Sequence, residues 1–521
     1  MATQYQLPES PSVALAPPPA DPTRKRQYYI LVFLFLLETL LVIHLRVLAL
    51  PFFWDEHGQF IPTALDLLRS GSWIAHSTAP NVHPPGVEAY LVLWYKLLGF
   101  SIPVTRVAML VLAAFGLLVT FLLTLELTER RSTATPAFLA CVFLGASPLF
   151  FTQSMMAELD MPAMLFTLLA LLLFLRKNYA ASAVTSIGLV LAKETGLVVP
   201  VVLCLFLLSR KDWRRAAYFL APGVVLLAWL LFLHRSTGYW LGNPSFAHYN
   251  VTYALHPARV AMSFVRHMYY LFFAEFRWIG TMVLLITIWR AKEFRKDAWR
   301  VVIAVAAVNI VVVTVLGGAE LERYLLPVLP FFYIAVAIAL TCLQRSIRVV
   351  ATTGLAVGLL INLFWNPPYP FPYENNYAMV DFVRLQQLAA DFVQRNLANR
   401  TIATAWPYSA ALKSPDYGFV DHGLKVIETN DFHFSSIRAL PAKSYDVLIT
   451  YTRTWAPKSG VIGIPIVREF LSRFYQFQPE ISEDQCRNLG LKKIVSWKRN
   501  GQEITIYMPR GIAGTSRMAV L

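Results

Sequence analysis

The sequence contains a long series of apolar runs, each about as long as the hydrocarbon core of a bilayer is thick. The first run covers residues 28–49, and the last ends at residue 365. Only 15% of all residues are charged and 56% are hydrophobic, whereas a soluble domain has about a quarter of its residues charged. This composition excludes a disordered chain and argues against an ordinary soluble enzyme. We expect an α-helical polytopic membrane protein, because a helix satisfies its own backbone groups in lipid.

The apolar runs predict about eleven transmembrane helices. The stretch 179–209 fits either two short helices or one long one, and we favour two because Gly196 and the charges beside it suit a break. The segment 86–99 is too short to span and is expected to lie at the outer interface as an amphipathic helix. The predicted spans are 28–49, 103–126, 136–152, 161–176, 179–192, 197–209, 216–234, 268–289, 301–317, 324–343 and 348–365.

The formal net charge of +15 has a topological explanation. If the N-terminus lies inside, every basic cluster falls on the cytoplasmic side, including RKDWRR at 210–215 and RAKEFRKDAWR at 290–300. Lys and Arg are enriched in cytoplasmic loops of membrane proteins. We therefore expect a multi-pass protein of the cell (inner) membrane with a cytoplasmic N-terminus. Membrane lipids are its expected surroundings, and no nucleic-acid partner is expected.

Composition also divides the chain into parts. Residues 1–27 are Pro-rich and polar and are expected to form a disordered cytoplasmic tail. Residues 28–365 form the expected membrane domain, with a large first outer loop at 50–102. Residues 366–375 read as a Pro-rich and aromatic linker. Residues 376–521 have ordinary charge density, begin with a helical pattern and continue with the strand-like runs TIATAW, YDVLITY, LKKIVSW and QEITIYM, which predicts an extracytoplasmic α/β domain.

Ionisable side chains at membrane depth are costly, so their positions point to function. In this chain they gather at the outer ends of the predicted spans, in several separate loops. The candidates are Asp55 and Glu56 in PFFWDEHGQF, His83 in NVHPPG, Asp160 in ELDMP, Lys193 in LAKETG, Arg266 in the 235–267 loop, and Arg323 and Tyr324 in ELERYLLP.

Several of these residues also have purely structural interpretations. Asp160 can cap the fourth span, and Lys193 can neutralise a partner within the bundle. Arg323 and Tyr324 can anchor a helix in the headgroup region. His83 can be an ordinary hydrogen-bonded loop histidine.

The motifs WDE, HPPG, ELDMP, LAKETGLVVP and ERYLLPVLP, in this order, resemble those of the GT-C membrane glycosyltransferases. The chain looks most like the bacterial branch that includes aminoarabinose transferases for lipid A, lipopolysaccharide galacturonosyltransferases and protein O-mannosyltransferase-like proteins. The resemblance covers residues 28–365 well and the C-terminal domain more loosely. It implies a GT-C fold and a polyprenyl-phosphate-linked sugar donor used on the outer face of the membrane.

The resemblance also implies roles for particular residues. Asp55, with Glu56 beside it, matches the first-loop acidic residue, and Asp160 matches the second-loop acidic residue. Asp55 is our candidate base, because transfer to a hydroxyl requires removal of its proton. A leaving lipid phosphate needs positive charge and hydrogen-bond donors. The candidates for that task are His83, Lys193, Arg266, Arg323 and Tyr324.

A divalent ion, Mg²⁺ or Mn²⁺, held by Asp55, Glu56 or Asp160 could assist the phosphate, although no ligand spacing demands one. A Glu that precedes the Lys-Pro motif of the aminoarabinose transferases is Val82 here, which argues against their metal site and substrate.

The sequence thus predicts an inverting hexosyl or pentosyl transferase that acts on a glycolipid, lipid A, a glycan or a protein hydroxyl. The alternative is a transporter or flippase of lipid-linked sugars, which would explain the spans and the outer charges equally well.

Overall fold

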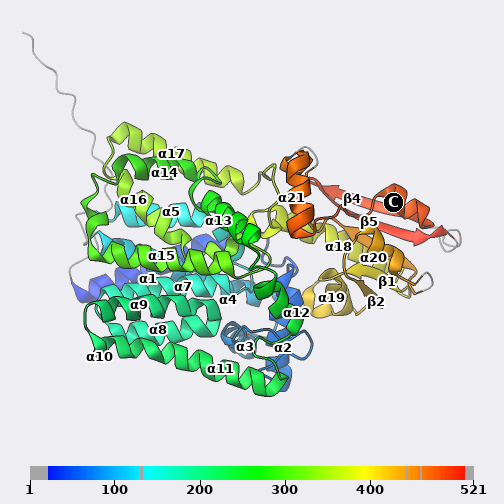
Figure 1. The fold of residues 1–521 in the computed structure, drawn as a ribbon, viewed down its shortest axis with the longest axis horizontal. Coiled ribbons are helices and arrows are strands. Elements are labelled where there is room, and N and C mark those ends of the chain that lie inside the picture. The colour runs from blue at the N-terminus through cyan, green and yellow to red at the C-terminus, as the bar shows by residue number, and fades with distance from the viewer. Residues whose placement is uncertain (1–20, 129–132, 442–443, 458–459, 511–521) are drawn as a thin grey trace, which may run out of the picture.

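The computed structural model describes residues 21–128, 133–441, 444–457 and 460–510. A bundle of helices occupies one end of the molecule, and a small sheet with its own helices occupies the other (Figure 1). Residues 1–20 of the predicted tail lie outside the described residues. The first helix starts at Pro22, ahead of the first apolar run, because Asp21 accepts a hydrogen bond from the backbone of Thr23 and Pro22 suits a first helical position.

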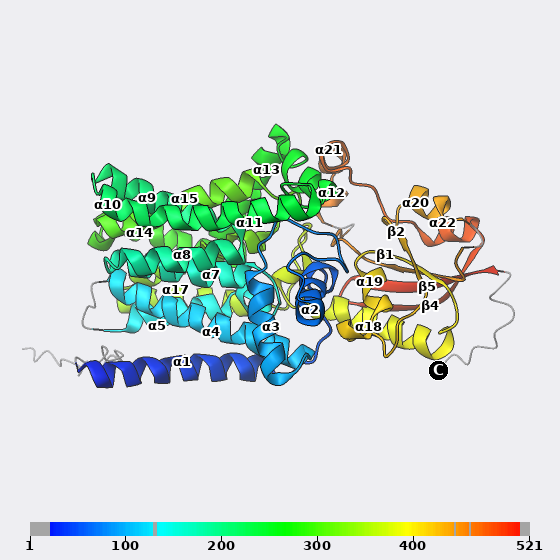
Figure 2. The same ribbon diagram turned by 90° about the horizontal axis from the view of Figure 1, so that it is seen from below.

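The helical end is built from elements that run mostly along the long axis of the molecule (Figure 2). These are α1 (Pro22–His44), α4 (Ile102–Leu127), α5 (Thr135–Ala146), α6 (Pro148–Gln153), α7 (Asp160–Leu175), α8 (Tyr179–Ala192), η2 (Glu194–Leu197), α9 (Val198–Ser209), α10 (Trp213–Ala216), η3 (Ala217–Leu220), α11 (Ala221–Thr237), α12 (Pro244–Ala247), η4 (His248–Thr252), α13 (Pro257–Phe272), α14 (Arg277–Thr287), η5 (Lys292–Arg295), α15 (Asp297–Val315), η6 (Glu322–Leu325), α16 (Leu329–Leu340) and α17 (Arg345–Asn362).

Within the described residues, four helices are long and apolar enough to cross a membrane, or five if one bent pair counts as a single span. Five further apolar helices have 10–17 residues. The helical, multi-pass class is therefore confirmed, and the count of about eleven spans stays a prediction. The break expected inside 179–209 is present, since Lys193 between α8 and α9 is extended.

The predicted span 268–289 is wrong as a single straight helix. α13 ends at Phe272 and α14 starts at Arg277, and the two axes are bent by 81°. Glu275 and Phe276 between them have φ of 55° and 62°, a conformation that ends a helix. The Arg277 guanidinium donates to the Tyr270 carbonyl at 2.8 Å and so satisfies a backbone group that the break leaves free.

The first outer loop contains η1 (Glu56–Phe60), α2 (Ile61–Ser70) and α3 (Gly86–Leu98). The helix expected at 86–99 is therefore confirmed. Figure 2 shows α2 and α3 beside the C-terminal domain, whereas α10, which carries basic residues of the RKDWRR cluster, lies at the opposite end of the bundle.

The C-terminal domain contains a five-stranded sheet in the order β2-β1-β3-β5-β4. β1 pairs in parallel with β2 and β3, and β5 pairs antiparallel with β3 and β4. The four predicted strands and the first helix are confirmed, and β2 is the strand that the sequence reading missed. The elements are η7 (Tyr373–Asn375), α18 (Ala378–Asn396), β1 (Ile402–Ala405), α19 (Tyr408–Lys413), η8 (Pro415–Tyr417), β2 (Val426–Thr429), α20 (Phe434–Ala439), β3 (Val447–Tyr451), η9 (Val461–Gly463), α21 (Pro465–Tyr475), α22 (Glu483–Asn488), β4 (Leu491–Arg499) and β5 (Gln502–Pro509).

The first outer loop and the C-terminal domain are fastened together. Arg69 on α2 makes two hydrogen bonds of 2.9 Å to Asp416. The ring of Phe53 packs edge-on against Phe382 of α18, with centroids 5.5 Å apart. This junction holds the loop that carries Asp55 against the domain that follows the membrane helices.

Candidate active site

A cavity of ≈ 860 Å³ lies where the helical bundle meets the C-terminal domain. The first outer loop, the starts of α7 and η2, the segment around η4, the segment 316–324, the linker and the C-terminal domain all contribute to its lining. Six predicted residues line it: Asp55, His83, Asp160, Lys193, Arg323 and Tyr324, and Arg266 is a seventh. Glu56, the remaining candidate, does not line the cavity.

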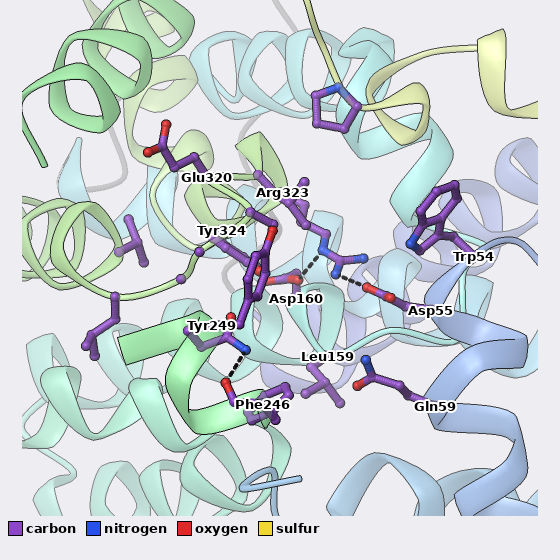
Figure 3. A pocket seen from close by; sticks show the side chains of 18 of the residues that line it. Trp54, Asp55, Gln59, Leu159, Asp160, Phe246, Tyr249, Glu320, Arg323 and Tyr324 are labelled. Atoms are coloured by element: carbon purple, nitrogen blue, oxygen red, sulfur yellow. Dashed lines mark hydrogen bonds and ion pairs between the residues drawn. The ribbon is translucent and has the colours of Figure 1, made fainter. Parts of the chain in front are cut away.

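Arg323 stands at the centre of the polar residues (Figure 3). Its guanidinium lies 2.5 Å from an oxygen of Asp55, 3.5 Å from Asp160 and 3.4 Å from Glu374, and it also pairs with Glu158. These five residues come from four separate parts of the chain. The arrangement concentrates four carboxyl groups around one cation that is itself buried.

Asp55 differs from the other three carboxyls in exposure. Its side chain is 17% exposed, compared with 1% for Glu158, 3% for Asp160 and 6% for Glu374. Asp55 is therefore the carboxyl of this group that a molecule in the cavity reaches most readily.

Two of the buried carboxyls hold their protons more tightly than usual. Burial raises the pKa of Glu374 to about 7, with Arg323 acting in the opposite direction. Burial also raises the pKa of Glu158 well above its ordinary value. Burial thus disfavours the charged form of both carboxyls, and the attraction of Arg323 opposes this effect.

The raised pKa of Glu374 predicts a pH dependence of stability. Its pKa is about 7 in the folded protein and 4.5 for a free glutamate side chain, so the folded state binds the proton more tightly. The contribution of protonated Glu374 to the free energy of unfolding is complete below about pH 4.5 and is lost as the pH rises through about 7. We expect the apparent Tm to fall by a few degrees between about pH 5 and pH 8, and this fall to shrink in Glu374→Gln. Thermal unfolding of the purified protein measures this, with exposed Glu483→Gln as the control. An unchanged slope in Glu374→Gln would contradict it.

Lys193 and Tyr324 form the next contact away from Arg323. The Lys193 ammonium lies 2.5 Å from an oxygen of Asp160 and 4.4 Å from the centre of the Tyr324 ring. Gly317 has a φ of 100°, and a Cβ there would meet the Tyr324 ring at 2.9 Å, so the turn before η6 requires glycine. The glycines of GGAELERY thus allow the backbone to pass close to this tyrosine.

His83 and Arg266 line the cavity with acidic partners of their own. His83 Nδ1 lies 2.7 Å from Glu194, and Arg266 Nε donates to Glu322 at 2.6 Å. Glu322 also accepts from Asn375 of the linker at 3.0 Å. Both side chains are therefore held by carboxyl partners where they line the cavity.

Glu56 occupies a different environment from its neighbour Asp55. It is fully buried and pairs with Arg106 of α4, with one nitrogen–oxygen distance of 2.9 Å. The backbone amides of Phe53 and Ala157 donate to it at 2.8 and 2.7 Å. Glu56 was predicted beside Asp55 as a catalytic candidate. Glu56 points away from the cavity because successive residues on a helical turn point about 100° apart. Its hydrogen-bond donors from α4 and from two backbone amides indicate that it fixes the loop.

This position gives a prediction for Glu56→Gln. Removing one charge of a fully buried ion pair leaves Arg106 uncompensated, which costs about 3–5 kcal/mol. We expect a marked fall in the apparent Tm, with transfer activity per folded molecule largely retained. Thermal unfolding and activity, both normalised to folded protein, measure the two effects. Normal stability together with lost activity would show that Glu56 acts in the chemistry.

Several lining residues escaped the sequence reading. Glu374 comes from the linker, and Trp406, Arg453 and Tyr475 come from the C-terminal domain. The hydroxyl of Tyr475 donates to Glu320, which precedes η6, at 2.9 Å. For Glu374, the signal available in the sequence is the aromatic and acidic composition of the linker, which the sequence analysis interprets only as a connection between domains.

The divalent ion considered for this site stays a prediction. Among the described residues, no group of three or more His, Cys, Asp and Glu side chains is placed to hold a metal ion. The carboxyls that were candidate ligands face the guanidinium of Arg323 and the ammonium of Lys193. In this structure Asp55 and Asp160 are therefore paired with cations of the protein itself.

Comparisons with known proteins agree with this arrangement. Residues 82–318 match the family model of Glycosyltransferase family 87. The structure resembles that of ArnT from Cupriavidus metallidurans in the apo state, with a TM-score of 0.55 and 15% identity, over 92% of this chain and 98% of that one. It also resembles ArnT from the same organism bound to undecaprenyl phosphate, with a TM-score of 0.52 and 13% identity, over 93% and 98% of the two chains. No curated protein sequence matches the chain.

At these identities the structural likeness shows the fold, which is the GT-C fold of membrane glycosyltransferases. The family match lies in the same membrane domain and extends from the HPPG motif to the loop before η6. Together they support a membrane glycosyltransferase of the GT-C superfamily and confirm the resemblance that the order of the motifs indicated.

Proposed function

We propose that the protein transfers a hexosyl or pentosyl group from a polyprenyl-phosphate-linked donor to a hydroxyl group on the outer face of the cell membrane. The observation that carries the proposal is the partly exposed carboxylate of Asp55 in a cavity that also presents Lys193, His83 and Tyr324. A base and a set of cations in one cavity are what this reaction needs. The ArnT structure with undecaprenyl phosphate supports a lipid-phosphate donor for this fold.

In the proposed reaction, the acceptor hydroxyl oxygen attacks the anomeric carbon of the donor. Its proton passes to Asp55 as the new carbon–oxygen bond forms, and the bond from the anomeric carbon to phosphate oxygen breaks. Both electrons of that bond leave with the phosphate, so the products are the glycoside, with inverted configuration, and the lipid phosphate. Lys193, His83 and Tyr324 supply positive charge and donors to the leaving phosphate. No general acid is required, because the phosphate leaves as a stable anion.

Arg323 has a distinct task in this proposal. Its guanidinium is already engaged by four carboxyls, which leaves little of its charge for a phosphate. Its planar fork instead holds Asp55 and Asp160 in fixed positions. Arg266, paired with Glu322, lies at the edge of the cavity and is placed to attract an anionic headgroup.

The proposed site lies at the same end of the bundle as the first outer loop and the C-terminal domain (Figure 2). The basic loop around α10 lies at the other end. Because basic loops favour the cytoplasm, this arrangement supports an extracytoplasmic active site, a cytoplasmic N-terminus and a location in the cell (inner) membrane.

The test is cleavage of the donor by the purified protein in lipid nanodiscs. Polyprenyl-phosphate-linked sugars with radiolabelled hexose or pentose are offered together with membrane extracts as a source of acceptors. We expect a labelled glycoside and free polyprenyl phosphate in equal amounts. A flippase would move the donor lipid between the leaflets of a vesicle and leave its glycosyl–phosphate bond intact, and that outcome would overturn the proposal.

The cations around the carboxyls also predict the response to chelators. Since Asp55 and Asp160 are already paired with Arg323 and Lys193, we expect transfer to persist in EDTA within about twofold. The measurement is the initial rate with EDTA, with added Mg²⁺ or with added Mn²⁺. A loss of more than about tenfold in EDTA, restored by one of these ions, would contradict this prediction.

A further inference from the structure

The end of the cavity next to the C-terminal domain is aromatic. Trp54 from the first outer loop and Trp406 from the segment after β1 both line it, with ring centroids 6.1 Å apart and planes at 87°. Both side chains are half-buried, so parts of their surfaces face the cavity. The proposed reaction, as described above, assigns these two residues no role.

The backbone of Trp54 is strained. Its φ is 31°, in the region that residues other than glycine rarely adopt. Such strain is about 1–3 kcal/mol and persists where the surrounding structure imposes it. The adjacent Asp55 is the proposed base, so the strained backbone places an indole beside the reactive carboxylate.

Trp406 is fitted equally closely against the loop. A Cβ added to Gly58 would lie 2.5 Å from its ring, so glycine is required where the loop passes the indole. The first outer loop, which carries Trp54 and Asp55, therefore packs closely against the C-terminal domain at Gly58.

A cation completes the aromatic end. The Arg453 guanidinium lies 5.7 Å from the centre of the Trp54 ring, and one of its nitrogens donates to the Asn430 carbonyl at 3.1 Å. Arg453 lines the cavity, and so does the exposed Thr454 that follows it. The two side chains offer hydrogen-bond donors next to the two indoles.

Trp54 lies on the opposite side of Asp55 from Tyr324, one of the proposed phosphate-binding residues. In Figure 3, Trp54 lies to one side of Asp55, whereas Arg323, Asp160 and Tyr324 lie to the other. A base must lie within hydrogen-bond reach of the acceptor hydroxyl, and in an inverting displacement that hydroxyl attacks the anomeric carbon from the side opposite the leaving phosphate. If the donor phosphate lies near Lys193 and Tyr324, the acceptor approaches from the side of Trp54.

We infer that Trp54, Trp406 and Arg453 form the acceptor subsite and that the acceptor is a saccharide chain. The inference rests on the proposed function and names the substrate class of the same site. One face of a sugar ring presents C–H groups, which pack on the negative face of an indole, while its hydroxyls accept hydrogen bonds from Arg453 and Thr454. A flexible Ser/Thr peptide would make no comparable use of two indole rings.

The experiment measures binding and therefore does not depend on turnover. Full-length protein in nanodiscs is applied to immobilised neutral hexose oligosaccharides and, in a second arm, to immobilised peptides that contain Ser and Thr. The variants are Trp406→Ala and Trp406→Phe, with Trp497→Ala as the matched control. Trp497 is a half-buried tryptophan of the same domain that packs on Phe392 and does not line the cavity.

We expect oligosaccharides to bind, the affinity to fall by about tenfold or more in Trp406→Ala and by less in Trp406→Phe, and Trp497→Ala to bind as the wild type does. The inference is overturned if no oligosaccharide binds, if Trp406→Ala binds normally, or if only the peptides bind. Asp55→Asn separates this result from the proposed function, because it should keep saccharide binding and lose transfer. If donor cleavage depends on Asp55 while no saccharide binds, the enzyme activity stands and the acceptor assignment fails.

Discussion

Asp55→Asn is expected to lower transfer by at least about 10²-fold, the usual contribution of a positioned general base. The amide keeps the size of the carboxyl and can still accept a hydrogen bond from Arg323, which lies 2.5 Å away. It cannot take the proton of the acceptor hydroxyl. The effect should therefore fall on kcat more than on the KM for the donor. The measurement is the initial rate of labelled glycoside formation in nanodiscs at saturating donor.

A matched control is Asp416→Asn. Asp416 also accepts hydrogen bonds from an arginine, Arg69, but at the outer surface and away from the cavity. We expect this variant to transfer the sugar at nearly the wild-type rate. Full activity of Asp55→Asn would show that another group takes the proton, and Asp160, with its side chain 3% exposed, would be the next carboxylate to test.

Arg323→Met is expected to have the largest effect on stability and to abolish transfer. It removes the cation that faces Asp55, Glu158, Asp160 and Glu374, three of which are buried. Loss of one partner of a buried ion pair costs about 3–5 kcal/mol, and here several carboxyls lose their partner together. The apparent Tm and the rate of transfer, both measured in nanodiscs, test this prediction.

Two comparisons make the result of Arg323→Met specific. Arg69→Met removes a cation that is 58% exposed, and we expect a change below about 1 kcal/mol. The Arg323→Met variant should also become relatively more stable as the pH is lowered, because protonation of the carboxyls relieves their repulsion. A variant with wild-type Tm at neutral pH would contradict the central position given to Arg323.

The pattern of the sequence located most of the polar lining of the cavity. Asp55, Asp160, Lys193 and Tyr324 lie at the outer ends of predicted spans, His83 lies within the first outer loop, and all five line one cavity. These positions are informative because an ionisable side chain at membrane depth is energetically costly and is therefore rare outside functional sites. Their roles remain proposals, since their chemistry has still to be tested.

Other parts of the site depend on contacts between distant segments. Glu374 lies in the Pro-rich and aromatic linker and Trp406 in a domain of ordinary composition, both far along the chain from Asp55. Nothing local distinguishes them from a spacer acid and a core tryptophan. They become lining residues only because the linker and the C-terminal domain pack against the first outer loop.

By itself the sequence determined the class of the protein, the order of its apolar helices and the end of each helix at which polar groups gather. Hydropathy determines these features, because lipid accepts only backbone that is hydrogen-bonded within its own segment. The tertiary structure decided the different environments of Asp55 and Glu56. They are neighbours in sequence, but the turn that starts η1 sends Asp55 into the cavity and Glu56 to Arg106, since adjacent residues on a helical turn point about 100° apart.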